Sequence, residues 1–490
     1  MGKKVVVVPK EEPKKSTVER LNKSVTAAVT ETFKEKVKEE ATREDESISA
    51  FARKSLKDEI YQDLHPEQNV EEIVNSGHAQ RSEVQKKPLV RQEEVITQDN
   101  TVSVAGMNKY LKLLKVINNK QSRKAILNDM FEMNFEQDKV ELIRTDGETW
   151  INISVPKWHG DITPFVAKFS TLLTLFATNK SKTASFAVKN NQVVINFSDG
   201  LSSNVYVMGT EEFPANIKSE EAQNIEHVIQ IDGNSLRMLL RSIEYAQNDD
   251  PTIKSLHAAN FEIENGKLVL TATDGFRLAR LEYIVKNEKP YKFLLRSEDI
   301  YALIDILAEI KNTAVEIYAM EKYVEFRVGE VQLIVKKIDD QFPNISHVIP
   351  KDEDIQIRMD LKANAMYDAL RSLASNYAKK DQIVFLTLLK KDQENLILSV
   401  KNSEIGMSEV KVPIHIELNT YKNEDTNDED FKVAFHPEFL MQPLKLFSSY
   451  GYGTNSEFRV IFEFVGLQKP LIIKPDSPAK TFAIIMPIRI

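Results

Sequence analysis

The tripeptide Thr-Asp-Gly occurs twice in this chain, at Thr145–Gly147 and at Thr273–Gly275, which lie about 130 residues apart. A second marker, Phe-Pro, recurs with its phenylalanines at Phe213 and Phe342, at nearly the same spacing. Another step of that length reaches Lys401-Asn402-Ser403, a turn-forming stretch between two apolar runs. The spacing is far longer than that of solenoid repeats. The sequence therefore predicts three copies of a whole domain, each with its own core.

Composition sets the broad class. A chain of 490 residues is too long for one hydrophobic core, and about 150 residues per domain gives about three domains. The absence of cysteine excludes disulfides, iron–sulfur clusters, Cys-ligated zinc and thiol nucleophiles. No signal peptide or membrane-spanning stretch is evident, so we expect a cytoplasmic protein with no membrane partner. The net charge of −8 argues against indiscriminate nucleic-acid coating, but a basic surface on one face remains compatible with it.

Residues 1–101 differ from the rest of the chain. Lysine and glutamate dominate this segment, and its only aromatic residues are Phe33, Phe51 and Tyr61. Such a segment cannot bury enough apolar surface to offset its ordering entropy, so we predict a mostly disordered arm. The predicted domains that follow it are copy one (102–222), copy two (223–350) and copy three (351–490).

Each copy shows the same order, a helix followed by strands, twice over. Apolar residues at helical spacing predict helices over 107–118, 163–177, 234–246, 297–310, 362–377 and 437–448. Alternating or short apolar runs predict strands over 130–135, 139–144, 150–155, 184–188, 192–197, 204–208, 259–263, 267–271, 314–318, 323–328, 332–337, 383–389, 396–400, 457–464, 470–473 and 482–490. Helices on one side of antiparallel sheets make an α+β fold, with six similar half-units along the chain.

No catalytic constellation stands out. The chain lacks a phosphate-binding Gly-rich loop, a His-Glu-x-x-His motif and a Gly-x-Ser-x-Gly motif. Asp146 and Asp274 could act as paired acids, but Asp-Gly between two strands is more often a turn, because aspartate hydrogen-bonds locally and glycine accepts positive φ. We therefore expect no enzyme activity, no cofactor and no metal site.

The helices carry the more informative chemistry. Basic side chains lie opposite the apolar stripe on the first helix of each copy, where they could face a phosphate backbone without reading bases. The predicted DNA-facing residues are Lys109, Lys112, Lys115, Arg237, Arg241, Arg371, Lys379 and Lys380. The predicted helix over 297–310 carries Asp299, Asp305 and Glu309, so the basic surface is not uniform.

Three motifs resemble the bacterial replicative sliding clamp, the β subunit of DNA polymerase III. The stretch from Leu268 to Ala279, with Thr-Asp-Gly-Phe-Arg-Leu inside it, is similar to a Thr-Asp-Gly-His-Arg-Leu segment of that family's middle domain. The stretch 340–350 resembles the linker to its third domain, and the ending Ile-Ile-Met-Pro-Ile-Arg-Ile resembles its C-terminus. The resemblance covers about 102–490 and is weakest in copy one. The charged arm has no counterpart in the usual family chain, so the resemblance points to a viral or otherwise divergent member with an N-terminal extension.

The resemblance implies a homodimeric ring around double-stranded DNA that tethers a DNA polymerase and is placed by a clamp loader. It also implies a partner-peptide cleft between copies two and three. Carried over by position, its residues are Leu256, Thr273, Gly275, Phe276, Arg277, Leu278, Pro343, Val348, Phe439, Ile484, Met486, Pro487 and Ile488. Phe276 replaces the family's usual histidine, so partner preference is expected to differ. Two alternatives stay open: a structural protein that uses the same fold without encircling DNA, and an enzyme that uses the two aspartates.

Overall fold

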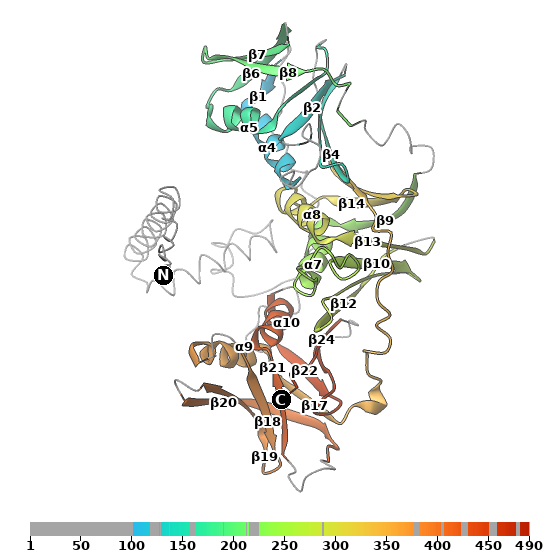
Figure 1. Ribbon diagram of the computed structural model, residues 1–490, viewed down its shortest axis with the longest axis vertical. Helices are drawn as coiled ribbons and strands as arrows, with labels where there is room; N and C mark the ends of the chain where they lie inside the picture. The colour runs from blue at the N-terminus through green and yellow to red at the C-terminus, as the bar shows by residue number, and fades with distance from the viewer. Residues whose placement is uncertain are drawn as a thin grey trace, which may run out of the picture. The chain divides into compact units, whose positions relative to one another are not determined.

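The computed structural model describes residues 101–489 apart from several short segments (Figure 1). The segments left out within that range are 118–126, 128, 137, 157–161, 190, 212, 215–224, 287–288, 377–381, 403–405, 423–429, 450–457 and 477–480. The predicted arm therefore lies outside the described residues. The described residues belong to one compact unit that runs to Ile490, and the division into three domains stays a prediction.

One order of elements, strand, helix and three strands, recurs through this part of the chain. In copy one the first half comprises β1 (Thr101–Ser103), α4 (Val104–Leu113) with the short 3-10 turn η1 (Leu114–Val116), β2 (Met130–Phe135), β3 (Lys139–Thr145) and β4 (Thr149–Pro156). The second half comprises β5 (Phe165–Lys168), α5 (Phe169–Thr178), β6 (Thr183–Lys189), β7 (Gln192–Phe197) and β8 (Ser202–Met208).

Copies two and three follow the same order. Copy two contains β9 (Glu226–Asp232), α7 (Gly233–Glu244), β10 (Ala258–Glu264), β11 (Lys267–Thr273), β12 (Arg277–Ile284), β13 (Tyr291–Arg296), α8 (Ser297–Glu309), β14 (Ala314–Ala319), β15 (Tyr323–Val328) and β16 (Val331–Lys336). Copy three contains β17 (Ile357–Lys362), α9 (Ala363–Ser372), β18 (Val384–Leu389), β19 (Asp392–Asn402), β20 (Gly406–Asn419), β21 (Phe431–Phe435), α10 (Pro437–Ser449), β22 (Arg459–Phe464), β23 (Leu471–Pro475) and β24 (Phe482–Ile485).

The two halves of each copy exchange their first strands. In copy two, β9 pairs with β14 of the second half, and β13 pairs with β10 of the first half. Copy one makes the same exchange through β1–β6 and β5–β2, and copy three through β17–β22 and β21–β18. The last strands then join neighbouring copies, because β4 pairs with β16 and β12 pairs with β24. Two twelve-stranded antiparallel sheets result.

The helices follow from local sequence. Ser103 Oγ accepts a hydrogen bond from Gly106 N at 3.2 Å and starts α4, while Asp232 Oδ2 accepts one from Ser235 N at 2.8 Å and starts α7. In α7 the buried side is formed by Leu236, Leu240 and Ile243 at helical spacing. In each copy the two helices lie together on one side of the sheets (Figure 1).

Two large clusters of buried side chains fill the space between helices and sheets. One runs continuously through copies one and two, from Val102 to Val335, and the other fills copy three, from Ile357 to Ile485. The cores of the first two copies are thus joined, whereas the sequence predicts one core per copy. None of the described helices is long and apolar enough to cross a membrane.

The structure corrects two predicted helix starts and adds the first strand of each half. Residues 165–168, predicted as helix, form β5, and Lys362, predicted as the helix start, ends β17. Four more first strands, β1, β9, β13 and β21, have no counterpart among the predicted elements. These strands run into a helix without an intervening turn, so local patterning does not separate the two.

Candidate partner cleft and DNA-facing helices

The second Thr-Asp-Gly turn is built by its own side chains. Asp274 Oδ1 accepts hydrogen bonds from Phe276 N and Arg277 N, both at 2.9 Å, and Thr273 Oγ1 accepts one from Gly275 N at 3.2 Å. Gly275 has φ of 91°, which favours glycine. The first turn repeats this pattern, with Asp146 Oδ1 accepting from Glu148 N and Thr149 N. The prediction of two turns is confirmed, and both aspartates are occupied in holding the backbone.

Arg277, two residues after Gly275 of the second turn, links copy two to copy three through its contacts with α10. Its Nε donates to Asp274 Oδ2 at 2.8 Å, and its Nη1 donates to Gln442 Oε1 on α10. Its guanidinium also lies 4.3 Å from the ring centroid of Phe439, as in a cation–π contact. Directly beside it, β12 pairs with β24, and Met486 N donates to the Phe276 carbonyl at 2.8 Å. The turn and the end of the chain are therefore held together.

A cavity of about 710 Å³ opens at this seam. Its floor is apolar, because Leu278 and Ile484 are almost fully buried in one cluster with Ile355 and Ile472. Its rim exposes large apolar side chains, led by Phe276 at 65% exposure. Ten of the thirteen predicted cleft residues line it: Leu256, Thr273, Gly275, Phe276, Arg277, Leu278, Pro343, Val348, Ile484 and Met486. An apolar groove with few polar groups suits a short peptide with apolar side chains.

The three other predicted cleft residues lie nearby but do not line the cavity. Phe439 contacts Arg277 from α10, while Pro487 and Ile488 continue past the rim, and Ile488 N donates to the Ala434 carbonyl at 2.8 Å. Sequence reasoning missed further lining residues: Asn344, Ile345, His347, Pro350, Asp354, Val465, Gln468, Lys469 and Pro470. Asn344, Ile345, His347 and Pro350 lie within the 340–350 linker motif and Asp354 follows it, so taking the whole motif as cleft lining would have found the first four. The 465–470 loop carries no comparable signal.

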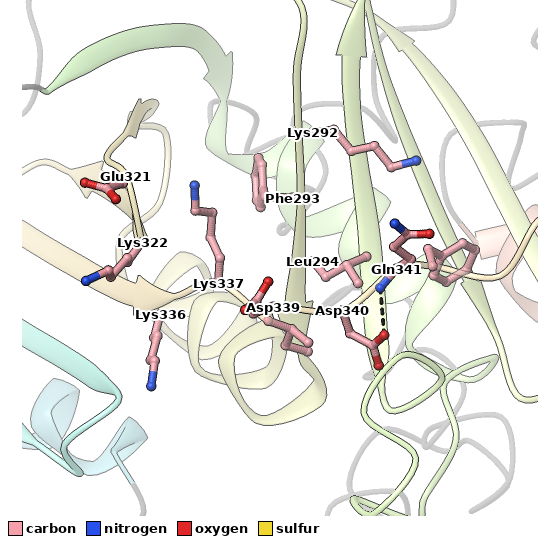
Figure 2. Close-up of a pocket in the computed structure, with 12 residues that line it drawn as sticks. Lys292, Phe293, Leu294, Glu321, Lys322, Lys336, Lys337, Asp339, Asp340 and Gln341 are labelled. Carbon is pink, nitrogen blue, oxygen red and sulfur yellow. Dashed lines mark hydrogen bonds between the residues drawn. The ribbon is translucent and has the colours of Figure 1, made fainter.

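A second hollow, of about 760 Å³, lies between the start of the linker and β13, and four lysines surround it (Figure 2). Their side chains point in different directions (Figure 2). Lys337 Nζ donates to the Met320 carbonyl at 3.0 Å, and Lys292 forms an ion pair of 2.7 Å with Glu262. The four cations do not converge on one point, so this hollow offers no single position at which they would hold an anion together.

The chain is similar to known clamps in sequence and in structure. Residues 230–344 match the family model described as the DNA polymerase III beta subunit, central domain. A beta sliding clamp of Bacillus subtilis (strain 168) is 24% identical over 364 residues, which cover 72% of this chain and 89% of that protein. Together with the solved structures, these matches support a bacterial-type member of the sliding-clamp family.

Solved structures agree on the fold. A DNA polymerase sliding clamp from Bacillus subtilis superimposes with a TM-score of 0.70 at 19% identity, covering 80% of this chain and 98% of that one. The DNA polymerase III β subunit of Thermotoga maritima gives a TM-score of 0.68 at 20% identity, covering 80% and 99%. Together with the relatives named beta sliding clamp, these matches support a clamp that serves as a non-catalytic processivity factor.

The clamp presents the predicted DNA-facing cations on helices of all three copies. Lys109, Lys112 and Arg371 are exposed on α4 and α9, and Lys115 is exposed in the turn η1. Arg237 and Arg241 are half-buried on α7. Lys379 and Lys380 lie outside the described residues.

His436, at the start of α10, adds a titratable group to the clamp near Arg277. Burial lowers the pKa of His436 below its usual 6.5, Glu438 opposes this shift, and Arg277 reinforces it. Its ring lies 4.7 Å from that of Phe439. Close to the seam, the clamp thus keeps an imidazole that resists protonation.

Proposed function

We propose that this clamp closes as a homodimer around double-stranded DNA and tethers a DNA polymerase through the cleft between copies two and three. The proposal rests on which strand pairs with the last strand of each half. Four of these strands, β4, β16, β12 and β24, pair across copies. The two that remain are β8 and β20, in copies one and three. If the last strands always pair across copies, β8 of one chain would pair with β20 of a second chain.

Both strands keep an edge for such pairing. Residues 202–206 of β8 pair with β7, and only its last two residues pair with β5 among the described residues. Residues 406–413 of β20 pair with β19, and only its later residues pair with β17. Large apolar side chains are exposed on both strands, with Tyr206 at 79% and Met407 at 61%. Edges left open in a folded protein invite pairing with another chain.

The open side of β8 can be identified from its hydrogen bonds. Val207 N donates to the Asn191 carbonyl, and the Leu201 carbonyl accepts from Phe197 N, so the odd-numbered residues face β7. In an antiparallel strand the even-numbered residues then direct their N–H and C=O groups to the open side. Asn204 and Tyr206 would therefore supply the bonds to β20 of a second copy. Pairing of β8 with β20 in both directions closes a dimer with two equal contacts.

A closed dimer explains why cations lie on helices in all three copies. DNA held by topology needs sequence-independent attraction only, and lysine and arginine provide it by neutralising phosphates. The remaining surface stays free for the peptide segments of a polymerase and a clamp loader. Replication proteins work at the nucleoid, so we place this clamp in the cytoplasm.

Ring closure is tested with Asn204→Pro. Proline removes one N–H from the open side of β8 and leaves the bonds to β7 intact. We expect the variant to sediment as a monomer where the wild-type chain is a dimer, and to be lost from nicked circular DNA at moderate salt. Wild-type protein should remain on circles and leave when the DNA is linearised. Equal retention on linear and circular DNA would refute encirclement.

The cleft is tested with Phe276→Ser, which changes a 65% exposed side chain at the rim. Ile284→Ser is the matched control, since Ile284 is 85% exposed at the far end of the same strand. We expect Phe276→Ser to lower polymerase stimulation more than tenfold without changing the dimer, and Ile284→Ser to have no effect. Equal behaviour of the two variants would remove the cleft from the proposal.

A further inference from the structure

We propose that the junction between copies one and two is a second peptide cleft, which the chain keeps filled with its own Phe213-Pro214 segment. This inference rests on the proposed peptide role of the open cleft. The occupant it names is a segment of this chain, and the ligand class is a short peptide bearing an aromatic side chain. A partner peptide could enter only by displacing that segment.

The two junctions correspond position by position. Trp150 pairs with Ile334 across β4 and β16, as Leu278 pairs with Ile484 across β12 and β24. Trp150 and Leu278 each follow their Thr-Asp-Gly turn at the same distance along the chain. Leu127 precedes Leu256 by the spacing that also separates the two Phe-Pro markers. Three residues of the open cleft, Leu256, Leu278 and Ile484, thus have counterparts at the first junction in Leu127, Trp150 and Ile334.

The counterpart groove is filled. Trp150, Ile334, Leu127 and Phe213 form one buried cluster, and Phe213 is only 5% exposed within it. A tryptophan here replaces the smaller leucine of the open cleft, and its ring makes an edge contact with Tyr323 at 5.9 Å. The segment carrying Phe213 covers what remains.

The space around the glycines of the two Thr-Asp-Gly turns also differs between the filled and the open groove. A Cβ atom added at Gly147 would meet Leu127 Cδ1 at 3.4 Å, whereas one added at Gly275 would meet nothing within 4 Å. The second marker also behaves differently, because Phe342 is half-buried and lines the neighbouring lysine-bordered hollow drawn in Figure 2. Of this Phe-Pro segment only Pro343 lines the second cleft, whereas Phe213 is buried in the first.

One buried polar atom points to a ligand. Trp150 is 5% exposed, and its indole Nε1 has no hydrogen-bond partner among the described residues. Buried N–H groups are nearly always paired, so an unpaired one at this place needs an explanation. In a cleft that accepts an extended peptide, this N–H would donate to a peptide carbonyl. Its position at the floor of the filled groove fits that role.

A polar network holds the first turn in place while the groove is filled. Arg296 donates from Nη2 to Thr149 Oγ1 at 2.7 Å and from Nε to Asp299 Oδ2 at 2.8 Å, and its Nη1 contacts Glu148 at 2.5 Å. Thr149 in turn donates to Asp299 at 2.6 Å. Burial opposes the charge of Arg296, but the hydrogen bonds and charges of these carboxylates outweigh it and raise the pKa of Arg296. The frame of the groove is thus independent of Phe213 and should survive its removal.

Tryptophan fluorescence tests the proposal on the full-length protein. The chain has two tryptophans, so Trp158→Phe leaves Trp150 as the only reporter. In that background Phe213→Ala should shift the emission to longer wavelength, because water reaches the indole. The matched control is Phe342→Ala, the second marker, which should leave the emission unchanged. Phe213→Leu provides a better-filled second variant, with a smaller shift in the same direction.

The probe is the chain's own segment as a free peptide, acetyl-Glu-Glu-Phe-Pro-Ala-amide. At millimolar concentration it should return the emission of Phe213→Ala toward the wild-type wavelength, and the same peptide with alanine for phenylalanine should not. An unshifted emission in both Phe213 variants would overturn the plug. A shift that the peptide cannot reverse would overturn the cleft. Polymerase stimulation depends on the cleft between copies two and three only. An unchanged stimulation in Phe276→Ser would therefore count against the proposed function and would leave the plugged first junction untouched.

Discussion

Replacing Arg277 with alanine should loosen the seam between copies two and three without unfolding either copy. Arg277 and Asp274 are 14% and 11% exposed, so water screens their ion pair only in part. The change removes that pair, which lies within copy two, and two contacts that cross the seam, the bond to Gln442 and the cation–π contact with Phe439. A hydrogen bond to a charged group contributes about 1.5–3 kcal/mol, and a cation–π contact about 0.5–2 kcal/mol. Asp274 keeps its two backbone donors, so we expect the seam to be weaker by about 3 kcal/mol.

Hydrogen exchange measures this weakening locally. At about 1.4 kcal/mol per factor of ten, amides of β24 should exchange about a hundredfold faster if the seam opens as a unit. Amides of β16, at the other junction, serve as the internal reference and should not change. Gln442→Ala removes a single hydrogen bond to a charged group, so it should accelerate exchange in β24 by about tenfold. Less than threefold acceleration in Arg277→Ala, or equal acceleration at both junctions, would refute this account.

Three further predictions follow from the same geometry. His436→Gln should make the free energy of unfolding less dependent on pH. The pKa of His436 is below 6.5 in the folded chain, so as the pH falls through 6.5 the unfolded chain takes up a proton first and the wild-type protein loses stability. Urea midpoints measured between about pH 7 and about pH 5 would show this, and the same change of midpoint with pH in both proteins would contradict it. Replacing Lys109 and Lys112 with serine should reduce the slope of log K against log salt for DNA binding by about 0.9 for each phosphate that is no longer neutralised, whereas an unchanged slope would place these residues away from DNA. Gly147→Ala and Gly275→Ala should each destabilise the chain, because both glycines have positive φ, which strains any residue with a Cβ; calorimetry showing no loss of stability in either variant would contradict this.

The sequence predicts the repeated helices and most of the later strands in each half, because apolar spacing is a local property. The exchanged first strands were missed for a physical reason. Residues of β5 and β17 gain their strand conformation from partners in the sister half, and that pairing leaves no mark in a short window of sequence. Joining of the first two cores is likewise a long-range effect, since β4 of copy one meets β16 at the far end of copy two.

The open cleft was located in sequence because its residues sit in motifs that resemble a known family. The filled cleft was not, since no motif marks it. Trp150 and Phe213 look like ordinary core residues until the pairing with Ile334 places them beside the first turn. The loop residues at 465–470 face the cavity only because β22 and β23 bring that loop to the linker.

The exchange of first strands also limits which fragments of this protein can fold and how each copy forms. A chain interrupted between the halves of one copy contains neither half-sheet complete, since β9 needs β14 and β10 needs β13. We therefore expect no fragment smaller than a whole copy to fold alone, and half of one would recruit its missing strand from another molecule. Folding must wait for partners from the opposite ends of a copy to meet, which makes each copy a slow-forming, all-or-none unit. Limited proteolysis should accordingly release intact copies and few half-copies.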